Sequence, residues 1–367
     1  MRVKSDVYFT NLRTSFDENL LKKLRRLMLV AGIQNIDFHE KFTAIKVHFG
    51  EPGNLSFLRP NFVKVIADYV KEQGGIPYVT DCNTLYVGGR KNAPDHISAA
   101  YENGFTPFST GCHVIIGDGV KGTDDIAVPI DCEYVKAAKI GRAVMDSDVF
   151  ISLTHFKGHE CTGFGGAMKN IGMGCGSFDG KKEMHDSGKP VVNPEGCVGC
   201  KKCTAICAHS AITVPKGKAE IDYKKCVGCG RCIEICPKHT IELGNEDAND
   251  ILNRKIAEYT YAVVKDKPCF HVSIVMDVSP FCDCHAENDA AVIPNVGMFA
   301  SFDPVALDVA CADACNKQPA IRNSFLGEKE QGNDHFDTMH PATNWRTCVE
   351  HGEKIGLGSM EYRLIEI

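Results

Sequence analysis

The most constraining feature of the chain is a run of eight cysteines that falls into two copies of one pattern. The first copy is Cys197-x2-Cys200-x2-Cys203-x3-Cys207, and the second is Cys226-x2-Cys229-x2-Cys232-x3-Cys236. Three closely spaced thiolates can bind three corners of a cubane iron–sulfur cluster, while the fourth cysteine of each run reaches the other cluster. The spacing therefore predicts two [4Fe–4S] centres with interleaved ligands: Cys197, Cys200, Cys203 and Cys236 for one, and Cys226, Cys229, Cys232 and Cys207 for the other.

The two copies align at a constant offset of 29 residues, which indicates an internal duplication. The stretch resembles the bacterial two-cluster ferredoxin family over roughly residues 190–244. Pro237 follows the fourth cysteine of the second copy, whereas Ala208 takes its place in the first, so that loop is less restricted in φ. A zinc module is the alternative. Zinc sites usually use paired cysteines separated by a longer spacer, so the spacing favours iron–sulfur clusters.

Length and composition limit what the rest of the chain can be. The chain has 367 residues, of which 44% are hydrophobic and 24% charged, with a formal net charge of −6. This composition is typical of a globular protein, and without a basic excess we do not expect a nucleic-acid partner. The N-terminal residues contain no apolar segment long enough for a signal or a membrane span, so no membrane partner is expected. Nineteen cysteines beside oxygen-sensitive motifs indicate a reducing, cytoplasmic location and an anaerobic source.

Short β-rich apolar runs alternate with helical patterns outside the cysteine segment. Such alternation predicts an α/β fold with a largely parallel sheet, whose ligand site lies in loops beyond the carboxyl ends of the strands. The cysteine segment interrupts this pattern after Lys189, and helical sequence resumes near Asn249. We therefore expect a host domain of residues 1–189 plus 245–367, with a small α+β two-cluster module of residues 190–244 inserted. The expected strands are 6–12, 43–49, 76–80, 114–116, 149–153, 271–277 and 296–300, and the expected helices include 59–71, 96–101 and 304–314.

The densest candidate site in the host domain follows the strand 149–153 and runs from residue 155 to residue 176. Its glycines, including Gly163, Gly165 and Gly166, allow close approach of the backbone to a ligand, and the following short helix would favour an anion. Acid–base or metal-binding side chains are also concentrated there, although each one alone is more often structural. These side chains are His155, His159 and Lys169, with His185 further along the chain.

Three motifs of the host domain are similar to those of the DUF362 family. They are HFKGHECTGFGGAMKNIGMG, Cys282-Asp283-Cys284, and the segment from Ser301 to Asp308, SFDPVALD. The resemblance covers essentially the whole chain and implies a fold rather than a particular reaction.

The same glycine-rich segment is more distantly similar to the lactate racemase family, whose members hold a nickel pincer nucleotide on a lysine. That resemblance implies that Lys169 anchors a cofactor, His185 ligates a metal and His159 acts as acid or base. It also implies that Arg59 belongs to a loop that binds substrate or phosphate, although the start of that loop differs here, reading His48-Phe-Gly-Glu51. An additional metal or nucleotide-type cofactor in the host domain is the corresponding expectation.

The segment Cys282-Asp283-Cys284-His285 is a candidate third metal site. Two cysteines one residue apart point to opposite sides of an extended chain, so a turn is needed before both thiols can face one metal. Thiolates with an imidazole would suit iron or zinc. The alternative is a pair of half-buried thiols that only pack within a turn. Residues 81–84 and Arg90, at another strand exit, are expected to line the same pocket.

Together these features predict an oxidoreductase in which the inserted module exchanges low-potential electrons with a pocket in the host domain. The expected partners are a small-molecule substrate or bound metal cofactor, and a redox protein such as a ferredoxin or a reductase. A non-enzymatic electron carrier, or a factor for metal-cofactor assembly, is one alternative. A nickel-dependent, racemase-like isomerase is another. The chain has no GxGxxG motif between a strand and a helix, so a nicotinamide or flavin bound in Rossmann fashion is not expected.

Overall fold

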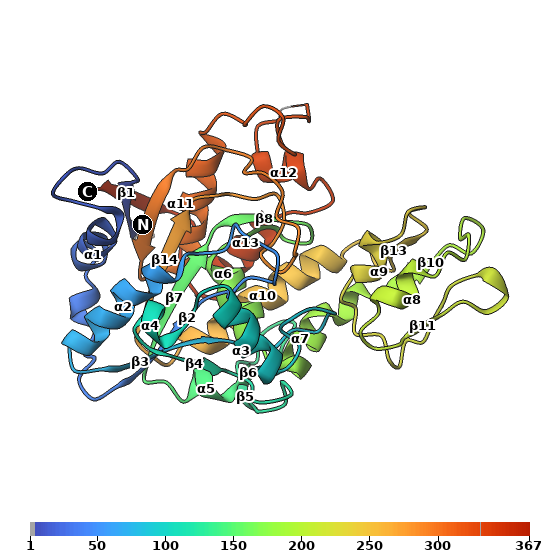
Figure 1. The fold of residues 1–367 in the computed structure, drawn as a ribbon, viewed down its shortest axis with the longest axis horizontal. Coiled ribbons are helices and arrows are strands. Elements are labelled where there is room, and N and C mark those ends of the chain that lie inside the picture. Colours follow the sequence, from blue (N-terminus) through green and yellow to red (C-terminus); the bar gives the residue numbers. More distant parts are fainter. Residues whose placement is uncertain (1–3, 331) are drawn as a thin grey trace.

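The computed structural model describes residues 4–330 and 332–367, and a single eight-stranded sheet runs through it (Figure 1). Seven strands point in one direction, and only β15 runs against its two neighbours. This confirms the prediction of an α/β fold with a largely parallel sheet. In spatial order the strands are β16 (Tyr362–Glu366), β1 (Ser5–Asn11), β15 (Gly297–Ser301), β14 (Cys269–Val275), β7 (Val149–His155), β2 (Phe42–Lys46), β3 (Ile76–Asp81) and β4 (His113–Ile116).

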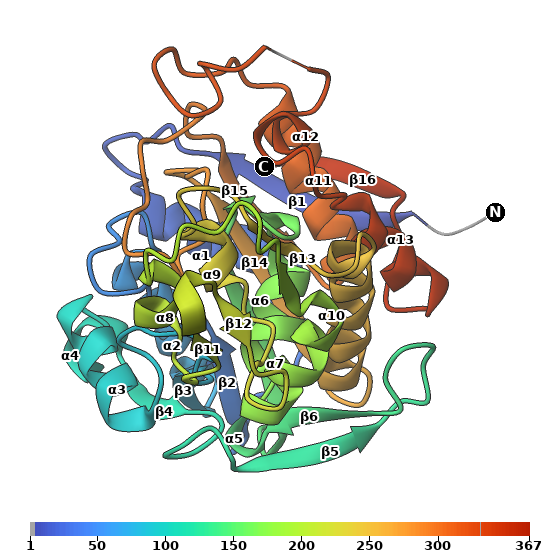
Figure 2. The same cartoon turned by 90° about the vertical axis from the view of Figure 1, so that its right-hand side faces the viewer.

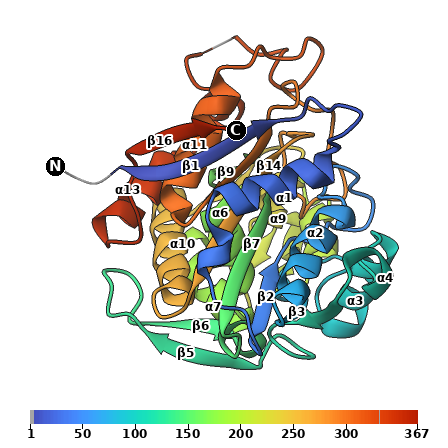
Figure 3. The same ribbon diagram turned by 90° about the vertical axis from the view of Figure 1, so that its left-hand side faces the viewer.

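Helices cover both faces of the sheet (Figure 3). All seven residues of the central strand β7 are buried, as expected for a parallel strand between two helical layers. Its neighbouring residues alternate between the layers: Phe150 packs in one hydrophobic core and Ile151 in the other. One layer contains α1 (Leu20–Val30) and α2 (Pro60–Glu72); the other contains α6 (Ala167–Cys175), α10 (Ala248–Val264), α11 (Pro304–Asn316) and α13 (Arg346–Lys354).

Shorter elements fill the connections. Helix α11 begins as its sequence predicts, because Asp303 caps it by accepting from the backbone N–H groups of Val305 and Ala306, and Pro304 is the first helical residue. The remaining host elements are η1 (Ile33–Asn35), α3 (Ala93–Glu102), α4 (Pro107–Thr110), β5 (Asp125–Pro129), β6 (Ala137–Gly141), α5 (Arg142–Met145), β8 (Lys157–His159), β9 (Gly163–Gly165), α7 (Phe178–His185), η2 (Asp186–Gly188) and α12 (His335–Met339).

The cysteine segment lies at one end of the molecule, beyond α7 and α10 (Figures 1 and 2). It has its own small core, and its first and last strands pair, so the chain leaves and re-enters the host at neighbouring points. The boundaries of an inserted domain stay a prediction. The elements of the segment are β10 (Pro190–Val192), α8 (Lys202–Ile206), β11 (Ile212–Thr213), η3 (Pro215–Gly217), β12 (Glu220–Ile221), α9 (Arg231–Glu234) and β13 (Ile241–Leu243).

The duplication in the sequence is also a duplication of backbone conformation. Helices α8 and α9 begin 29 residues apart, and so do β11 and β13. Left-handed residues recur at the same offset: Gly199 and Gly228 have φ of 66° and 75°, and Ser210 and His239 have φ of 48° and 49°. The two copies therefore turn at equivalent positions around their cysteines. Among the described residues, no helix is long and apolar enough to cross a membrane.

Candidate functional site

The main pocket lies at the carboxyl ends of the parallel strands, where the fold class predicts a ligand site. Its volume is about 970 Å³, counting the space at its open mouth. The loops after β2, β3 and β7, helices α6 and α7, and the cysteine segment all contribute to its wall. Among the lining residues are Lys46, His48, Asp81, Thr84, Tyr86, Arg90, Lys157, His159, Glu160, Cys161, Gly165, Gly166, Lys169, Lys181, His185, Cys229, Arg231, Glu234 and Cys284.

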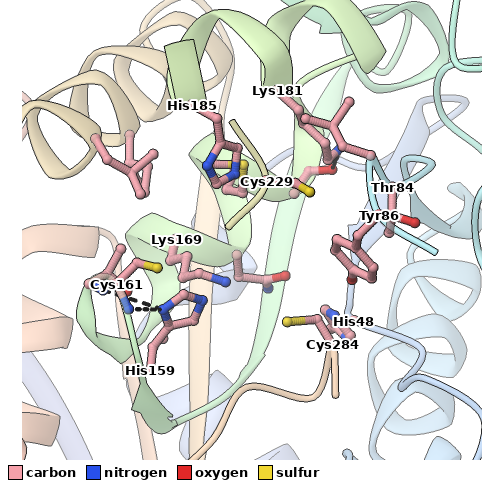
Figure 4. Close-up of a pocket in the computed structure, with 18 of the residues that line it drawn as sticks. His48, Thr84, Tyr86, His159, Cys161, Lys169, Lys181, His185, Cys229 and Cys284 are labelled. Atoms are coloured by element: carbon pink, nitrogen blue, oxygen red, sulfur yellow. Dashed lines mark hydrogen bonds between the residues drawn. The ribbon is translucent and has the colours of Figure 1, made fainter. Parts of the chain in front are cut away.

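Several residues singled out from the sequence meet at this pocket. His159, Lys169, His185, Gly165 and Gly166 line it. Figure 4 shows His159 and Lys169 on one side of the cavity, Tyr86 and Cys284 on another, and His185 beside Cys229. Asp81, Cys82, Thr84 and Arg90 of the β3 exit also contribute to the wall, as the strand pattern suggests, whereas Asn83 does not.

Three residues of the predicted catalytic and cofactor-binding set lie outside the pocket lining. His155 is buried, and its ring nitrogens lie 2.9 Å from Asp283 Oδ1 and from the carbonyl oxygen of Met276. Arg59 pairs with Asp277 at 2.9 Å and is 56% exposed. Gly163 has φ of +80°, and a side chain there would collide with Trp345. These residues position loops, and the structure does not bring them to the pocket.

The segment 282–285 forms the turn that a shared site requires. The N–H of His285 donates to the carbonyl of Cys282 at 3.0 Å, which reverses the chain. Candidate ligand atoms of Cys282, Cys284 and His159 all lie within 4.8 Å of one another. His285 instead groups with Glu160 and Cys284, and its Nε2 lies 3.1 Å from Glu160 Oε1. The structure thus replaces His285 with His159 as the imidazole nearest to both thiols.

The two thiols of this turn have opposite electrostatic surroundings. The pKa of Cys282 is held well below its ordinary value, chiefly by the hydrogen bond from Cys284 and also by Lys169 and His159, against the effect of burial. The pKa of Cys284 is correspondingly raised, first by sharing that hydrogen bond and then by burial. Lys169 Nζ donates to Cys282 Sγ at 3.4 Å. Burial would lower the pKa of Lys169, but the neighbouring thiolates and Glu160 raise it above its ordinary value, so it stays charged.

Hydrogen bonds fix the tautomer of His159. Its Nδ1 accepts from the backbone N–H groups of Cys161 at 3.0 Å and Thr162 at 3.3 Å. A nitrogen that accepts from N–H groups carries no proton, so the proton of the neutral ring lies on Nε2. His185 is neutral at pH 7, because burial and the nearby positive charge of Lys169 lower its pKa to about 4.

A buried carboxylate holds the turn in place. Asp283 is fully buried, and its oxygens contact His155 at 2.9 Å and Lys157 at 3.1 Å. Although burial alone would raise it, these two cationic partners keep the pKa of Asp283 well below its usual range. His155 and Lys157 therefore act on the pocket indirectly, by fixing the residue between Cys282 and Cys284.

The amino end of helix α6 is already occupied by a carboxyl group of the protein. Asp308 accepts from the N–H groups of Ala167 at 2.6 Å and Met168 at 2.9 Å. A side chain at Gly166 would meet an Asp308 oxygen at 2.3 Å, so the close approach needs glycine. The sequence suggests that this helix favours an anion. The acceptor is a carboxyl group of the chain itself, so these N–H groups are not available to an external phosphate.

Asp308→Asn is expected to change the pH dependence of stability. Burial raises the pKa of Asp308 to about 7, although the N–H groups of Met168 and Ala167 act in the opposite direction. An aspartate in the unfolded chain has a pKa of about 4. The fold therefore favours the protonated carboxyl, and its stabilisation decreases as the pH rises from about 4 to about 7. The difference in unfolding free energy between the original protein and Asp308→Asn should shrink over this range, as measured by denaturant titration. A constant difference would contradict the assignment.

A buried ionic network lies at the exits of β2 and β3, and the spacing of its residues in the sequence does not predict it. Lys46 Nζ lies 2.9 Å from Asp81 Oδ1 and donates to Asn170 at 2.8 Å. Arg90 lies 2.9 Å from Glu51 and 3.5 Å from Asp81. Both cations are 1% exposed or less. Buried charges of this kind are costly unless paired, so the network holds the two loops that carry Tyr86 and His48 in fixed positions.

Two smaller hollows in the cysteine segment match the two predicted ligand sets. One is lined by Cys197, Cys200, Cys203 and Cys236, and the other by Cys207, Cys226, Cys229 and Cys232. Backbone N–H groups are directed at sulfur in both: Ala219 donates to Cys197 at 3.4 Å, and Ala211 to Cys207 at 3.3 Å. A hollow walled by four thiols with amide donors fits an iron–sulfur cluster in its donor chemistry. The presence of clusters stays a prediction.

The second hollow adjoins the main pocket. Cys229 lines both cavities, and a side chain at Gly228 would meet the carbonyl oxygen of His185 at 2.4 Å. Arg231 donates to the carbonyl of Cys284 at 2.9 Å, and its guanidinium lies 4.8 Å from the centre of the Tyr86 ring. His209 also contacts the host, through its Nε2 at 2.7 Å from the Leu85 carbonyl. The segment is therefore docked on the pocket wall.

Comparison with known proteins assigns the chain to a family. A structural alignment with the lactate racemase apoprotein from Thermoanaerobacterium thermosaccharolyticum covers 75% of this chain and 52% of that protein, at 10% identity and a TM-score of 0.37. For a structural-genomics target protein from Thermotoga maritima the coverages are 85% and 59%, at 11% identity and a TM-score of 0.41. The chain thus spans little more than half of these two proteins. None of the curated proteins compared with it matches. The model of the family described as a domain of unknown function, DUF362, matches residues 43–313, and the chain belongs to that family.

Proposed function

We propose that this protein is an iron–sulfur oxidoreductase in which the segment 190–244 delivers electrons to the pocket of the α/β domain. The observation that carries the proposal is the double position of Cys229, which lines both the second four-cysteine hollow and the main pocket. An electron carrier bound at that hollow would touch the space where a substrate binds.

The residues that would hold the two centres are the two interleaved sets. Bound there, [4Fe–4S] clusters supply one-electron transfer at low potential. The chain's own contribution is to place the sulfur ligands, direct amide N–H groups at them and exclude water. The inner set, Cys207, Cys226, Cys229 and Cys232, adjoins the pocket, and the outer set, Cys197, Cys200, Cys203 and Cys236, lies around the other hollow.

The outer set has one exposed member and is the expected entry point for electrons. Cys200 is exposed, and so is Val198 next to it, with a relative exposure of 60%. The outer hollow is also surrounded by basic side chains, since Lys201, Lys202 and Lys238 line it. Residues 190–244 contain eight basic and five acidic residues in a chain whose net charge is −6. A redox partner with an acidic surface fits this end of the molecule.

Reversing charge at this end should slow reduction by an acidic partner. For the double variant Lys201→Glu/Lys202→Glu we expect a decrease of about tenfold in the second-order rate of reduction by a small acidic ferredoxin at low ionic strength. The loss should shrink as salt is added. Stopped-flow absorbance measures the rate. The exposed host residue Lys317 supplies the control, and an equal loss in Lys317→Glu would show that the effect is not local.

The proposal is tested by following the reoxidation of reduced protein. Protein purified without oxygen and reduced with dithionite would be mixed with two-electron acceptors such as enoates, α-keto acids and disulfides. His159→Ala and Lys169→Ala, which change the pocket wall, should slow reoxidation by the accepted compound, and Lys182→Ala, an exposed residue of α7, should not. If the pocket variants behave like Lys182→Ala with every acceptor, the protein is an electron carrier or assembly factor rather than an oxidoreductase.

A second candidate is the nickel-dependent isomerase. The observation that favours it is that His159, Lys169 and His185 all line one pocket, as that hypothesis requires. The isomerase hypothesis differs from the oxidoreductase hypothesis in the metal content it predicts, because it requires stoichiometric nickel that is lost in Lys169→Ala. Racemisation consumes no electrons, so the adjoining four-cysteine hollow favours the oxidoreductase.

A further inference from the structure

We propose that Cys282 and Cys284 are a redox-active pair that alternates between a dithiol and a disulfide and is the first electron acceptor inside the pocket. This inference rests on the proposed function for the source of its electrons. The pair itself is argued from the turn that carries it and from the groups around its sulfur atoms.

The turn places the two sulfurs for bond formation. They lie within 4.8 Å of each other, on either side of a residue whose carboxylate is fixed by two buried cations. A disulfide needs its sulfurs at about 2.05 Å, a change that side-chain rotation within an existing turn can provide. Cys284 lines the pocket, whereas Cys282 lies behind it with a relative exposure of 1%. A molecule in the pocket therefore reaches Cys284 first.

Hydrogen-bond donors lie next to the sulfur of Cys282, the cysteine of the pair that does not line the pocket. Lys169 Nζ donates to Cys282 Sγ at 3.4 Å. The proton of His159 lies on Nε2, because Nδ1 accepts two backbone N–H groups, and the ligand atoms of His159 and both cysteines share one 4.8 Å cluster. These donors stabilise a thiolate at Cys282 when the disulfide is opened.

The same arrangement disfavours a metal ion at these residues. A neutral imidazole binds a metal through an unprotonated nitrogen, but Nδ1 of His159 is already used by backbone donors and Nε2 carries the proton. The Lys169 ammonium occupies a position next to Cys282 that a cation would need. A dithiol with adjacent proton donors satisfies every one of these contacts without an added ion.

A short path connects the pair to the inner cysteine set. Arg231 follows Cys229 by two residues, and its guanidinium donates to the carbonyl of Cys284 at 2.9 Å. It is also within 4.8 Å of the Tyr86 ring, which lines the same pocket. The loop that carries the predicted cluster ligand Cys229 is thus hydrogen-bonded to the backbone of Cys284.

Reduction of the pair balances with two electrons. The Cys282–Cys284 S–S bond breaks, two electrons arrive one at a time from a low-potential one-electron donor, and one proton goes to Cys284. Cys282 remains a thiolate beside Lys169 and His159. Oxidation returns both electrons and the proton to a two-electron acceptor in the pocket.

The pair is tested first without using the clusters. Full-length protein kept free of oxygen is equilibrated in buffers of reduced and oxidised dithiothreitol of varying ratio, quenched with acid, alkylated and analysed by peptide mass spectrometry. We expect the peptide containing residues 282–285 to lose two alkyl groups together, as a two-electron couple. Cys161, which lines the same pocket, should stay alkylated throughout. Full alkylation of both cysteines at every ratio, or protection that a chelator removes, would overturn the inference.

A second arm separates this inference from the proposed function. The oxidised protein and a Cys229→Ala variant are each exposed to photoreduced deazaflavin, a one-electron donor, and the disulfide is followed by the same mapping. Faster reduction of the disulfide in the original protein than in Cys229→Ala supports both the redox pair and electron delivery by the segment 190–244. If the dithiothreitol titration shows the disulfide but Cys229→Ala is reduced equally fast, the redox pair stands and delivery by the segment 190–244 is wrong.

Discussion

Cys229→Ala is expected to abolish electron delivery to the pocket while leaving the α/β domain folded. Cys229 is the predicted ligand that lines both the inner hollow and the pocket, so its loss removes the carrier nearest to the substrate. Removing one of four cluster ligands should lower the iron content below about eight per chain. We expect reoxidation by a pocket acceptor to slow by about 100-fold or more, the effect of losing an essential redox centre.

The matched control is Cys161→Ala. Cys161 also lines the pocket, but it belongs to neither four-cysteine set. The iron content of Cys161→Ala should equal that of the original protein. Circular dichroism should show the same secondary structure for Cys161→Ala and Cys229→Ala. Equal iron content and equal reoxidation rates in Cys229→Ala and Cys161→Ala would show that the inner hollow has no part in electron transfer.

Lys169→Met is expected to produce the second large effect, because it removes a half-buried charge that lies beside a thiolate. Lys169 Nζ lies 3.4 Å from Cys282 Sγ. Without the cation the pKa of Cys282 should rise, so less thiolate is present at pH 7 and alkylation by iodoacetamide should slow by about tenfold or more. The lysine is half-buried, so its loss should cost less folding free energy than the about 3–5 kcal/mol typical of a fully buried ion pair.

The measurement is the rate of alkylation of Cys282 against pH, followed by mass spectrometry of the peptide. The midpoint should move to higher pH in Lys169→Met and return toward its original value in Lys169→Arg, which keeps the charge. Chemical denaturation of the three proteins separates the effect on stability from the effect on the thiol. Unchanged profiles in Lys169→Met would show that the lysine does not govern this thiol.

Much of the fold follows from the sequence because hydrophobic periodicity reports local structure directly. The predicted strand at 76–80 and the predicted helix at 59–71 agree with β3 and α2 to within about one residue. Periodicity does not report which strands pair. The order βαβ suggests that the first two strands neighbour each other, but β1 lies at the far side of the sheet between β15 and β16. Its partners come from the other end of the chain, more than 280 residues away in sequence.

The sequence predicts the cysteine sets of the site but not all of the contacts that build the pocket. Spacing alone groups the eight cysteines, because ligands of one loop must be close. It cannot place His155, which precedes the glycine-rich loop yet turns away to Asp283. It also gives no sign that Asp308 caps α6 from 140 residues away, since its neighbours in sequence read only as a helix. Contacts of this kind are set by packing between layers rather than by local pattern.

The Cys282–Cys284 pair shows what the structure adds. The sequence left open a metal site and a packed turn, because either needs two close thiols. The hydrogen bonds of His159 and the position of Lys169 favour a third interpretation, since they supply protons rather than an open ligand. The hydrogen bond from Arg231 to the Cys284 carbonyl could not have been expected, because the two residues are 53 positions apart along the chain.

The most direct test of the whole account is the metal and acid-labile sulfide content of protein purified without oxygen. The account predicts about eight irons and about eight sulfides per chain, as two [4Fe–4S] clusters require, with no stoichiometric nickel or zinc. Zinc at the cysteines with little sulfide, or nickel that depends on Lys169, would contradict it.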